Sequence, residues 1–196
     1  MAMTMLQMAG AAPTPATMAD GVLLIIDAQR EYTDGLLPLT GVGAAVEALA
    51  VLLEKARKAG SPIVHVRHKG PGKAFNPSST GFEIVKQLAP RDGETVIDKG
   101  LPNAFTGTEL ARHLQAAGRK NLIVGGFMTH MCVSATVRSA TDHGFMSTIA
   151  ADTVATRDLP DATGGETVAA AAVNRITLAA LSDRFAWIVP KAAQIA

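Results

Sequence analysis

The stretch NLIVGGFMTHMCVSATVRSATDHGF, residues 121–145, contains the pattern that decides the fold. Its first part, residues 121–127, is an apolar run of strand length, of the kind that is buried on both faces of a parallel sheet. Residues 131–144 follow at once with helical spacing, because Val133 and Val137 lie four residues apart on one side. A buried strand that turns directly into a helix is typical of a βαβ unit.

The same alternation continues in both directions along the chain. Strands are predicted at residues 21–27, 61–68, 94–99, 121–127, 145–152 and 184–190, and helices at residues 41–60, 82–89, 106–118, 131–144 and 164–183. Thr106 and Glu109 have the spacing of a capping box at the start of the third of these helices. Because strands and helices alternate, the sequence predicts a three-layer α/β/α fold around a six-stranded, mostly parallel, Rossmann-like sheet.

Composition limits the classes of function. The 196 residues include 18 Lys and Arg against 17 Asp and Glu, a net charge of +1, and we therefore expect no nucleic-acid partner. No apolar run reaches the roughly 18 residues that a transmembrane helix needs, so we expect no membrane partner. The first twenty residues lack the basic start of a signal peptide, which favours a cytoplasmic location over secretion.

Two segments stand apart from the alternating pattern. Residues 1–19, rich in Met, Ala, Thr and Pro, are predicted to form a flexible N-terminal arm, and residues 20–196 a single domain. Residues 69–81, rich in Gly, Pro and Ser, are predicted to form a long loop. Long loops without secondary structure are often lids over a site.

Three chemically complementary residues follow strands of the predicted sheet. In such sheets the ligand binds beyond the carboxyl ends of the strands. Asp27 ends the first strand, Lys99 ends the third, and Cys132 lies in the first turn of the helix after the fourth. The sequence therefore predicts that a carboxylate, an ammonium group and a thiol meet at one edge of the sheet.

Cys132 is the single cysteine of the chain, so neither an intrachain disulfide nor a zinc site built from several thiolates can form. A helix N-terminus and the Lys99 ammonium would each lower the pKa of its thiol, and Asp27 could serve as base and then as acid. Taken singly, each residue also has a plainer interpretation, as a small buried side chain, a turn former or a surface charge.

Three motifs carry a resemblance to a known family. IIDAQREY (residues 25–32), DKGLPNAFTGTEL (98–110) and GGFMTHMCVSATVRSATDHGF (125–145), in this order and spacing, are similar to those of the isochorismatase-like cysteine hydrolase superfamily. The resemblance covers residues 20–190. It implies a catalytic triad of Asp27, Lys99 and Cys132, a thioester intermediate, and a homo-oligomer, either a dimer or a tetramer.

The resemblance also implies details of the turn before Cys132. It suggests a cis peptide bond between Phe127 and Met128, which would aim the backbone N–H groups of Met128 and Cys132 at the substrate oxygen as an oxyanion hole. Thr129 would fix this turn through its hydroxyl. His130 either lines the substrate pocket or is a turn residue.

Aromatic and polar side chains near these motifs are candidates for the wall of a small pocket: Tyr32, Phe75, Asn76, Phe127 and His130. Packing in a subunit interface is the alternative for Tyr32 and Phe75. The nicotinamidase branch of the family has a metal-binding Asp-x-His motif where this chain reads HVRHKGPG, residues 65–72. His65 and His68, three apart on a strand, point to opposite faces, so we expect no catalytic metal and no cofactor.

These observations favour a metal-independent cysteine hydrolase that cleaves a C–N bond of a small amide, carbamoyl or ureido substrate. One alternative is a vinyl-ether hydrolase of the isochorismatase type, in which Asp27 acts as the acid and Cys132 takes no part. The other alternative is a catalytically silent binding protein that keeps the fold.

Overall fold

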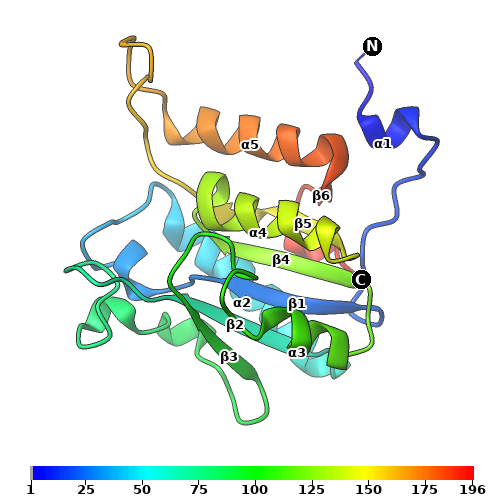
Figure 1. The fold of residues 1–196 in the computed structure, drawn as a ribbon, viewed down its shortest axis with the longest axis horizontal. Helices are drawn as coiled ribbons and strands as arrows, with labels where there is room; N and C mark the ends of the chain where they lie inside the picture. Colours follow the sequence, from blue (N-terminus) through cyan, green and yellow to red (C-terminus); the bar gives the residue numbers. More distant parts are fainter. Residues whose placement is uncertain (1) are drawn as a thin grey trace.

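The computed structural model describes residues 2–196 and confirms the predicted fold class, a six-stranded sheet between layers of helices (Figure 1). The strands are β1 (Gly21–Ile26), β2 (Ile63–His68), β3 (Thr95–Lys99), β4 (Asn121–Phe127), β5 (Met146–Ala155) and β6 (Ala186–Val189). The α-helices are α1 (Met5–Met8), α2 (Val42–Ala59), α3 (Leu110–Ala116), α4 (Ser134–Asp142) and α5 (Ala170–Arg184). None of the helices in this part of the chain is long and apolar enough to cross a membrane.

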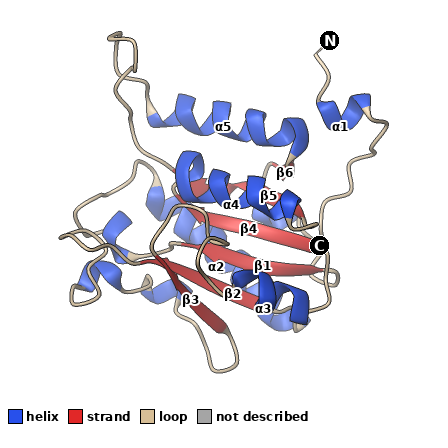
Figure 2. Cartoon of the chain, in the orientation of Figure 1, coloured by secondary structure: helices blue, strands red, loops and turns tan. Residues whose placement is uncertain are grey.

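Strand β1 shows why the central strands read as continuous apolar runs. Leu23 and Ile25 belong to the core beneath α2, whereas Val22, Leu24 and Ile26 belong to the core beneath α3, α4 and α5. All six residues of β1 are buried. Figure 2 shows the two layers, with α2 behind the sheet, α3 and α4 in front of it, and α5 above α4 in this view. A strand that is covered on both faces needs apolar side chains at every position.

The order of the strands places the site. They run β3-β2-β1-β4-β5-β6, and every neighbouring pair is parallel. The chain moves outward from β1 to β3 and then crosses back to β4, on the other side of β1. The order therefore reverses between β1 and β4, and the carboxyl ends of these two strands flank the crevice in which such folds bind ligands.

The predicted helix at residues 82–89 is absent. The chain instead forms two short 3₁₀ turns, Thr80–Phe82 and Lys86–Leu88. Between them Ile84 makes an antiparallel bridge with Gln29. The buried residues Phe82, Val85 and Leu88 recur every three positions, and this spacing suits an extended chain with 3₁₀ turns as well as it suits a helix.

Other element boundaries also differ from the prediction. The capping box predicted at Thr106 and Glu109 is wrong, because α3 begins only at Leu110 and the hydroxyl of Thr108, not that of Thr106, accepts the N–H of Leu110. α5 begins at residue 170 rather than 164, and a loop containing the bridge between Leu159 and Val168 precedes it. Backbone pairing inside this loop replaces the first helical turns that were expected there.

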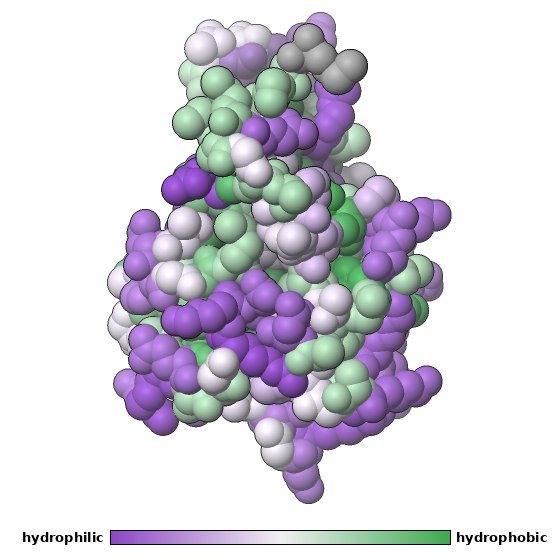
Figure 3. Space-filling view, turned by 90° about the vertical axis from the view of Figure 1, so that its right-hand side faces the viewer, coloured by the Kyte–Doolittle hydropathy of each residue, from purple (hydrophilic) through white to green (hydrophobic). Residues whose placement is uncertain are grey.

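The N-terminal arm lies against the rest of the chain. Ala16 and Met18 are buried, the Ala16 N–H donates to the Thr148 hydroxyl, and the Met5 N–H donates to Asp183. Figure 3 views the side of the molecule that carries α1, where a narrow upper part rises above a wide lower part rich in hydrophilic residues. Met8 in α1 remains 67% exposed.

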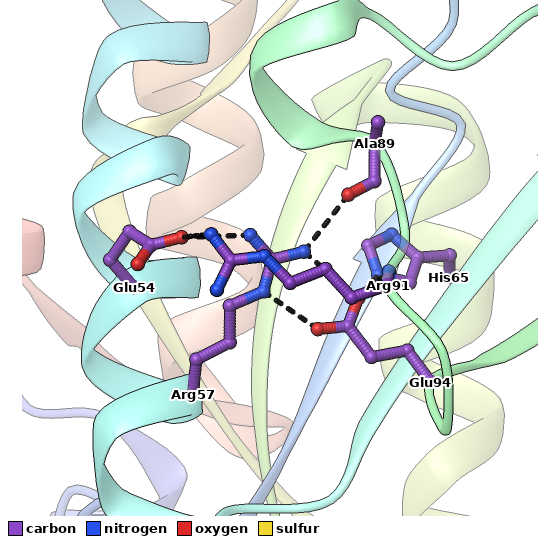
Figure 4. Close-up of polar contacts among 6 residues, drawn as sticks. All are labelled: Glu54, Arg57, His65, Ala89, Arg91 and Glu94. Atoms are coloured by element: carbon purple, nitrogen blue, oxygen red, sulfur yellow. Dashed lines mark hydrogen bonds and ion pairs between the residues drawn. The ribbon is translucent and has the colours of Figure 1, made fainter.

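A polar cluster ties α2 to the strands at the end of the sheet opposite Lys99 (Figure 4). Arg57 donates to Glu94 and Glu54, and the buried His65 ring contacts the Glu94 carboxylate at 2.9 Å. The Arg91 side chain also reaches Glu54. His65 therefore lies on β2, away from the carboxyl ends of the strands, and its ring is bound to Glu94.

Glu94 makes the stability of the fold sensitive to acid. Burial raises the pKa of its carboxyl, but hydrogen bonds from Arg57, the Arg91 N–H and His65 outweigh this and lower the pKa to about 2. A carboxyl whose pKa is lower in the folded than in the unfolded state stabilises the fold above its ordinary pKa, and this contribution is lost as the pH falls toward 2.

We therefore expect Glu94→Gln to lower the free energy of unfolding by on the order of 2 kcal/mol at pH 7, and by much less at pH 3. Urea unfolding at both pH values measures the difference. Glu109→Gln is the matched control, because Glu109 is exposed and its carboxylate pairs with the exposed Arg112. An equal loss at pH 7 and pH 3 would contradict the role of the Glu94 charge.

Candidate active site

Asp27 begins the loop that follows β1 and is completely buried. Its N–H donates to the carbonyl of Val66 on β2, which continues the pairing of the two strands by one residue. Its φ of +50° lies in the left-handed region, which aspartate tolerates better than most residues. The chain therefore turns sharply at Asp27, and the carboxylate lies at the carboxyl edge of the sheet.

Lys99 is the last residue of β3 and its side chain is buried. Its ammonium nitrogen lies 2.7 Å from Oδ2 of Asp27 and 3.3 Å from Sγ of Cys132, to which it donates a hydrogen bond. Because β2 lies between β3 and β1, only a long side chain can reach Asp27 from this position. The structure thus brings together the carboxylate, the ammonium group and the thiol that the sequence predicts to meet.

Cys132 lies in a π-helical turn, Thr129–Val133, that leads from β4 into α4. Gly126, near the end of β4, is required for the approach of β4 to β1, since a Cβ there would overlap the carbonyl oxygen of Ile26. The peptide bond between Phe127 and Met128 is cis, as the resemblance implies. The Thr129 hydroxyl donates to the carbonyl of Ala155, which joins this turn to the end of β5.

The electrostatics of Cys132 differ from the expectation. Burial, and then the Asp27 carboxylate, raise the pKa of the thiol to about 12, although Lys99 acts in the opposite direction. Burial likewise raises the pKa of Asp27, to about 6, against the effect of Lys99. The prediction of a low thiol pKa was wrong because a thiol that is only 3% exposed loses more by desolvation than one cation restores.

Two further residues adjoin the triad and were not assigned a role from the sequence. His68, paired with Lys99 across β2 and β3, has its Nδ1 3.2 Å from the Lys99 ammonium. Burial and then Lys99 lower the pKa of His68 to about 4, so its ring is neutral at pH 7 and Nδ1 accepts this hydrogen bond. The buried Gln29 fixes His68 by accepting its backbone N–H and donating to its carbonyl.

Three of the predicted pocket residues form one aromatic row beside the triad. The Tyr32 ring packs edge-on against Phe75 at 5.1 Å and against Phe127 at 5.9 Å between centroids. Phe75 packs in turn against the ring of His68 at 5.1 Å. Burial, and then the Asp27 carboxylate, raise the pKa of Tyr32.

The other two pocket candidates are engaged elsewhere. The Asn76 amide donates to the carbonyl of Gly72 and accepts the N–H of Ser78, so it supports its own loop. His130 contacts the hydroxyl of Thr156 through Nδ1. Their contact with a substrate stays a prediction. Within residues 2–196 no group of three or more His, Cys, Asp or Glu side chains is placed to hold a metal ion.

Comparisons with known proteins agree with this architecture. Residues 21–189 match the family model described as the isochorismatase domain. The chain is 38% identical over 184 residues to the secreted isochorismatase effector Isc1 of Verticillium dahliae, covering 93% of this chain and 94% of that protein. It is 34% identical over 156 residues to maleamate amidohydrolase of Pseudomonas putida, covering 69% and 72% of the two chains.

Among solved structures, an isochorismatase from Pseudomonas putida KT2440 superposes with a TM-score of 0.95. It shares 42% sequence identity with the protein, and the match covers 100% of both chains. The family model, the relatives and the shared fold all point the same way: the chain belongs to the isochorismatase family and is a hydrolase.

Proposed function

We propose that the protein is a metal-independent cysteine hydrolase that cleaves a C–N bond in a small amide, carbamoyl or ureido compound. The observation that carries this proposal is the position of the Lys99 ammonium, within 2.7 Å of the Asp27 carboxylate and 3.3 Å of the Cys132 sulfur. The similarity to a protein named maleamate amidohydrolase supports an amide as the substrate.

In the first half of the proposed reaction Cys132 attacks the substrate carbonyl. Asp27 takes the thiol proton as the S–C bond forms, and the negative charge moves to the carbonyl oxygen, where the backbone N–H groups of Met128 and Cys132 stabilise it. Asp27 then gives the proton to the leaving nitrogen, the C–N bond breaks, and ammonia or an amine departs. The acyl group remains on Cys132 as a thioester.

In the second half Asp27 takes a proton from water, and the resulting hydroxide attacks the thioester carbonyl. The C–S bond breaks, the carboxylic acid leaves, and the proton held by Asp27 returns to the sulfur. Because the pKa of the resting thiol is high, the proton leaves only as the nucleophile attacks, and Asp27 is needed in every turnover.

The raised pKa of Asp27 also favours a second candidate function. A buried carboxyl with a pKa of about 6 suits a general acid, as vinyl-ether hydrolysis of the isochorismatase type requires. In that reaction the sulfur forms no bond, so the two functions differ in whether the Cys132 thiol is needed.

A substrate screen tests the proposed function. Small amides, carbamates and ureido acids are incubated with the protein, and ammonia release is measured; isochorismate is included with a readout of pyruvate. Release of ammonia from at least one C–N compound supports the proposal. Turnover of isochorismate alone would replace it with the second candidate, and turnover of neither would favour a binding protein.

The pKa of Asp27 predicts the acidic side of the pH profile. Asp27 acts first as a base, so it must be ionised when the substrate binds. As the pH falls below about 6, we expect kcat/KM to fall about tenfold per pH unit. Measurement of kcat/KM between about pH 4.5 and about pH 8 tests this. A value that rises toward acid pH would point to Asp27 acting as the acid.

The cytoplasmic location and the homo-oligomer, dimer or tetramer, stay predictions. The exposed methionines of the N-terminal segment, Met3, Met5 and Met8, are apolar residues that a second copy of the chain could cover.

A further inference from the structure

The loop between β2 and β3 closes against the site at Phe75. Phe75 is only 7% exposed, and its ring packs against Tyr32 and against His68, whose Nδ1 lies 3.2 Å from the Lys99 ammonium. Its φ of +55° lies in the left-handed region, which is unfavourable for a bulky residue. Such a conformation persists only where its surroundings hold it. The structure must therefore contain groups that fix the backbone at this position.

Glu31 is one of these groups. Its side chain is 1% exposed, and its carboxylate oxygens accept two backbone N–H groups, that of Leu36 at 2.7 Å and that of Phe75 at 3.0 Å. Within residues 2–196 no lysine, arginine or histidine forms an ion pair with it. A buried carboxylate is costly unless hydrogen bonds compensate it, and the reaction proposed above makes no use of Glu31.

Gly81 leaves the space that the Glu31 carboxylate occupies. A Cβ at residue 81 would overlap Oε2 of Glu31 and lie 3.0 Å from its Cδ. Oε2 is the atom that accepts the Phe75 N–H. Alanine at this position would therefore push the Glu31 carboxylate away from the Phe75 N–H, without changing the charge of the carboxylate or its acceptor atoms. Gly72, in the same loop, has open space around its Cβ position.

We propose that Glu31 is a positioning residue that holds Phe75 closed against Tyr32 and His68 and thereby controls access to the Cys132 thiol and the size of substrate admitted. This inference rests on the proposed function only in treating the triad as the site. It assigns Glu31 no contact with the substrate.

Two substitutions disturb the hydrogen bond between Glu31 and the Phe75 N–H in different ways, and a third serves as the control. Glu31→Gln removes the charge and one of the two acceptors, whereas Gly81→Ala displaces an unchanged carboxylate. Gly72→Ala adds the same methyl group where nothing opposes it. Hydrogen exchange of the Phe75 amide and the rate of Cys132 labelling by a small and a bulky thiol reagent are measured for all three. Neither measurement requires a known substrate.

We expect Glu31→Gln and Gly81→Ala each to speed both exchange at Phe75 and labelling of Cys132 by about tenfold, with the larger gain for the bulky reagent, and Gly72→Ala to match the wild type. The double variant should be no faster than either single variant, since both act on one hydrogen bond. Once a substrate is known, we expect both variants to raise KM by a factor several times larger than the factor by which they lower kcat.

Three outcomes would overturn the inference: labelling and exchange at wild-type rates in both variants, the same rates in Gly81→Ala and Gly72→Ala, or additive effects in the double variant. Thermal unfolding identifies a variant that has lost its fold. Should Glu31→Gln unfold, Gly81→Ala still decides the outcome, because it leaves the buried carboxylate in the chain. Failure of the proposed function itself would instead appear as no turnover in the substrate screen, with these rates unaffected.

Discussion

Replacing Cys132 with alanine is expected to lower kcat/KM on a C–N substrate by at least about 10³-fold, because no other group near Asp27 and Lys99 can form the thioester. Stability should change little. The thiol is a small, buried group whose hydrogen bond with Lys99 is 3.3 Å long, and Lys99 keeps the Asp27 carboxylate as its partner. Ammonia release and urea unfolding, measured on the same preparation, separate the two effects.

Cys132→Ser is the matched control, since serine keeps a hydrogen-bonding group of similar size. Its hydroxyl is a far weaker nucleophile than a thiol, and an alkoxide is a poorer leaving group than a thiolate. Both variants should be inactive toward amides. Full turnover of a confirmed amide by Cys132→Ala would end the proposal of covalent catalysis. Unchanged isochorismate hydrolysis in the same variant would establish the second candidate function.

Lys99→Met is expected to abolish detectable turnover and also to destabilise the fold by about 3–5 kcal/mol at pH 7, because the completely buried Asp27 loses the cation that lies 2.7 Å from it. Without Lys99 the pKa of Asp27 rises further above its ordinary value, so the buried carboxyl is held protonated, and the cost of this falls as the pH is lowered toward 5. Denaturant unfolding at the two pH values measures this. Lys120→Met, which alters an exposed lysine, should be neutral.

The double variant Asp27→Asn/Lys99→Met shows whether the buried charge causes this loss. It removes both charges together, so we expect it to recover most of the stability lost in Lys99→Met and to remain inactive. A double variant as unstable as Lys99→Met alone would mean that packing of the lysine chain, rather than its charge, is what the fold requires.

The sequence predicts the sheet and the meeting of Asp27, Lys99 and Cys132 because both follow from local patterns and one rule of topology. Strand β1 is apolar at every position, and parallel strands bring their carboxyl ends to one edge. The rest depends on tertiary contacts. Burial sets the high pKa of Cys132, and the bridge between Ile84 and Gln29 replaces a helix with extended chain. The period of three at Phe82, Val85 and Leu88 was the available signal for those 3₁₀ turns.

Glu31 could not be identified from the sequence, because a charged residue that follows a strand usually lies in solvent. Its burial becomes evident only when residues 70–81 fold back over it. Gly81, which leaves space for the Glu31 carboxylate, was the available signal. It could not be recognised, because it belongs to a loop in which glycines are expected for other reasons.

Three groups of the protein surround the Lys99 ammonium: the Asp27 carboxylate, an ion-pair partner at 2.7 Å, Nδ1 of His68 at 3.2 Å and Sγ of Cys132 at 3.3 Å. In the proposed reaction we therefore expect Lys99 to orient Asp27 and Cys132 rather than to bind the incoming carbonyl oxygen. In the proposed reaction, main-chain N–H groups stabilise the charge that develops on that oxygen. We therefore expect Lys99 to act as a counter-ion, and the loops around Asp27, Lys99 and Cys132 to recognise the substrate.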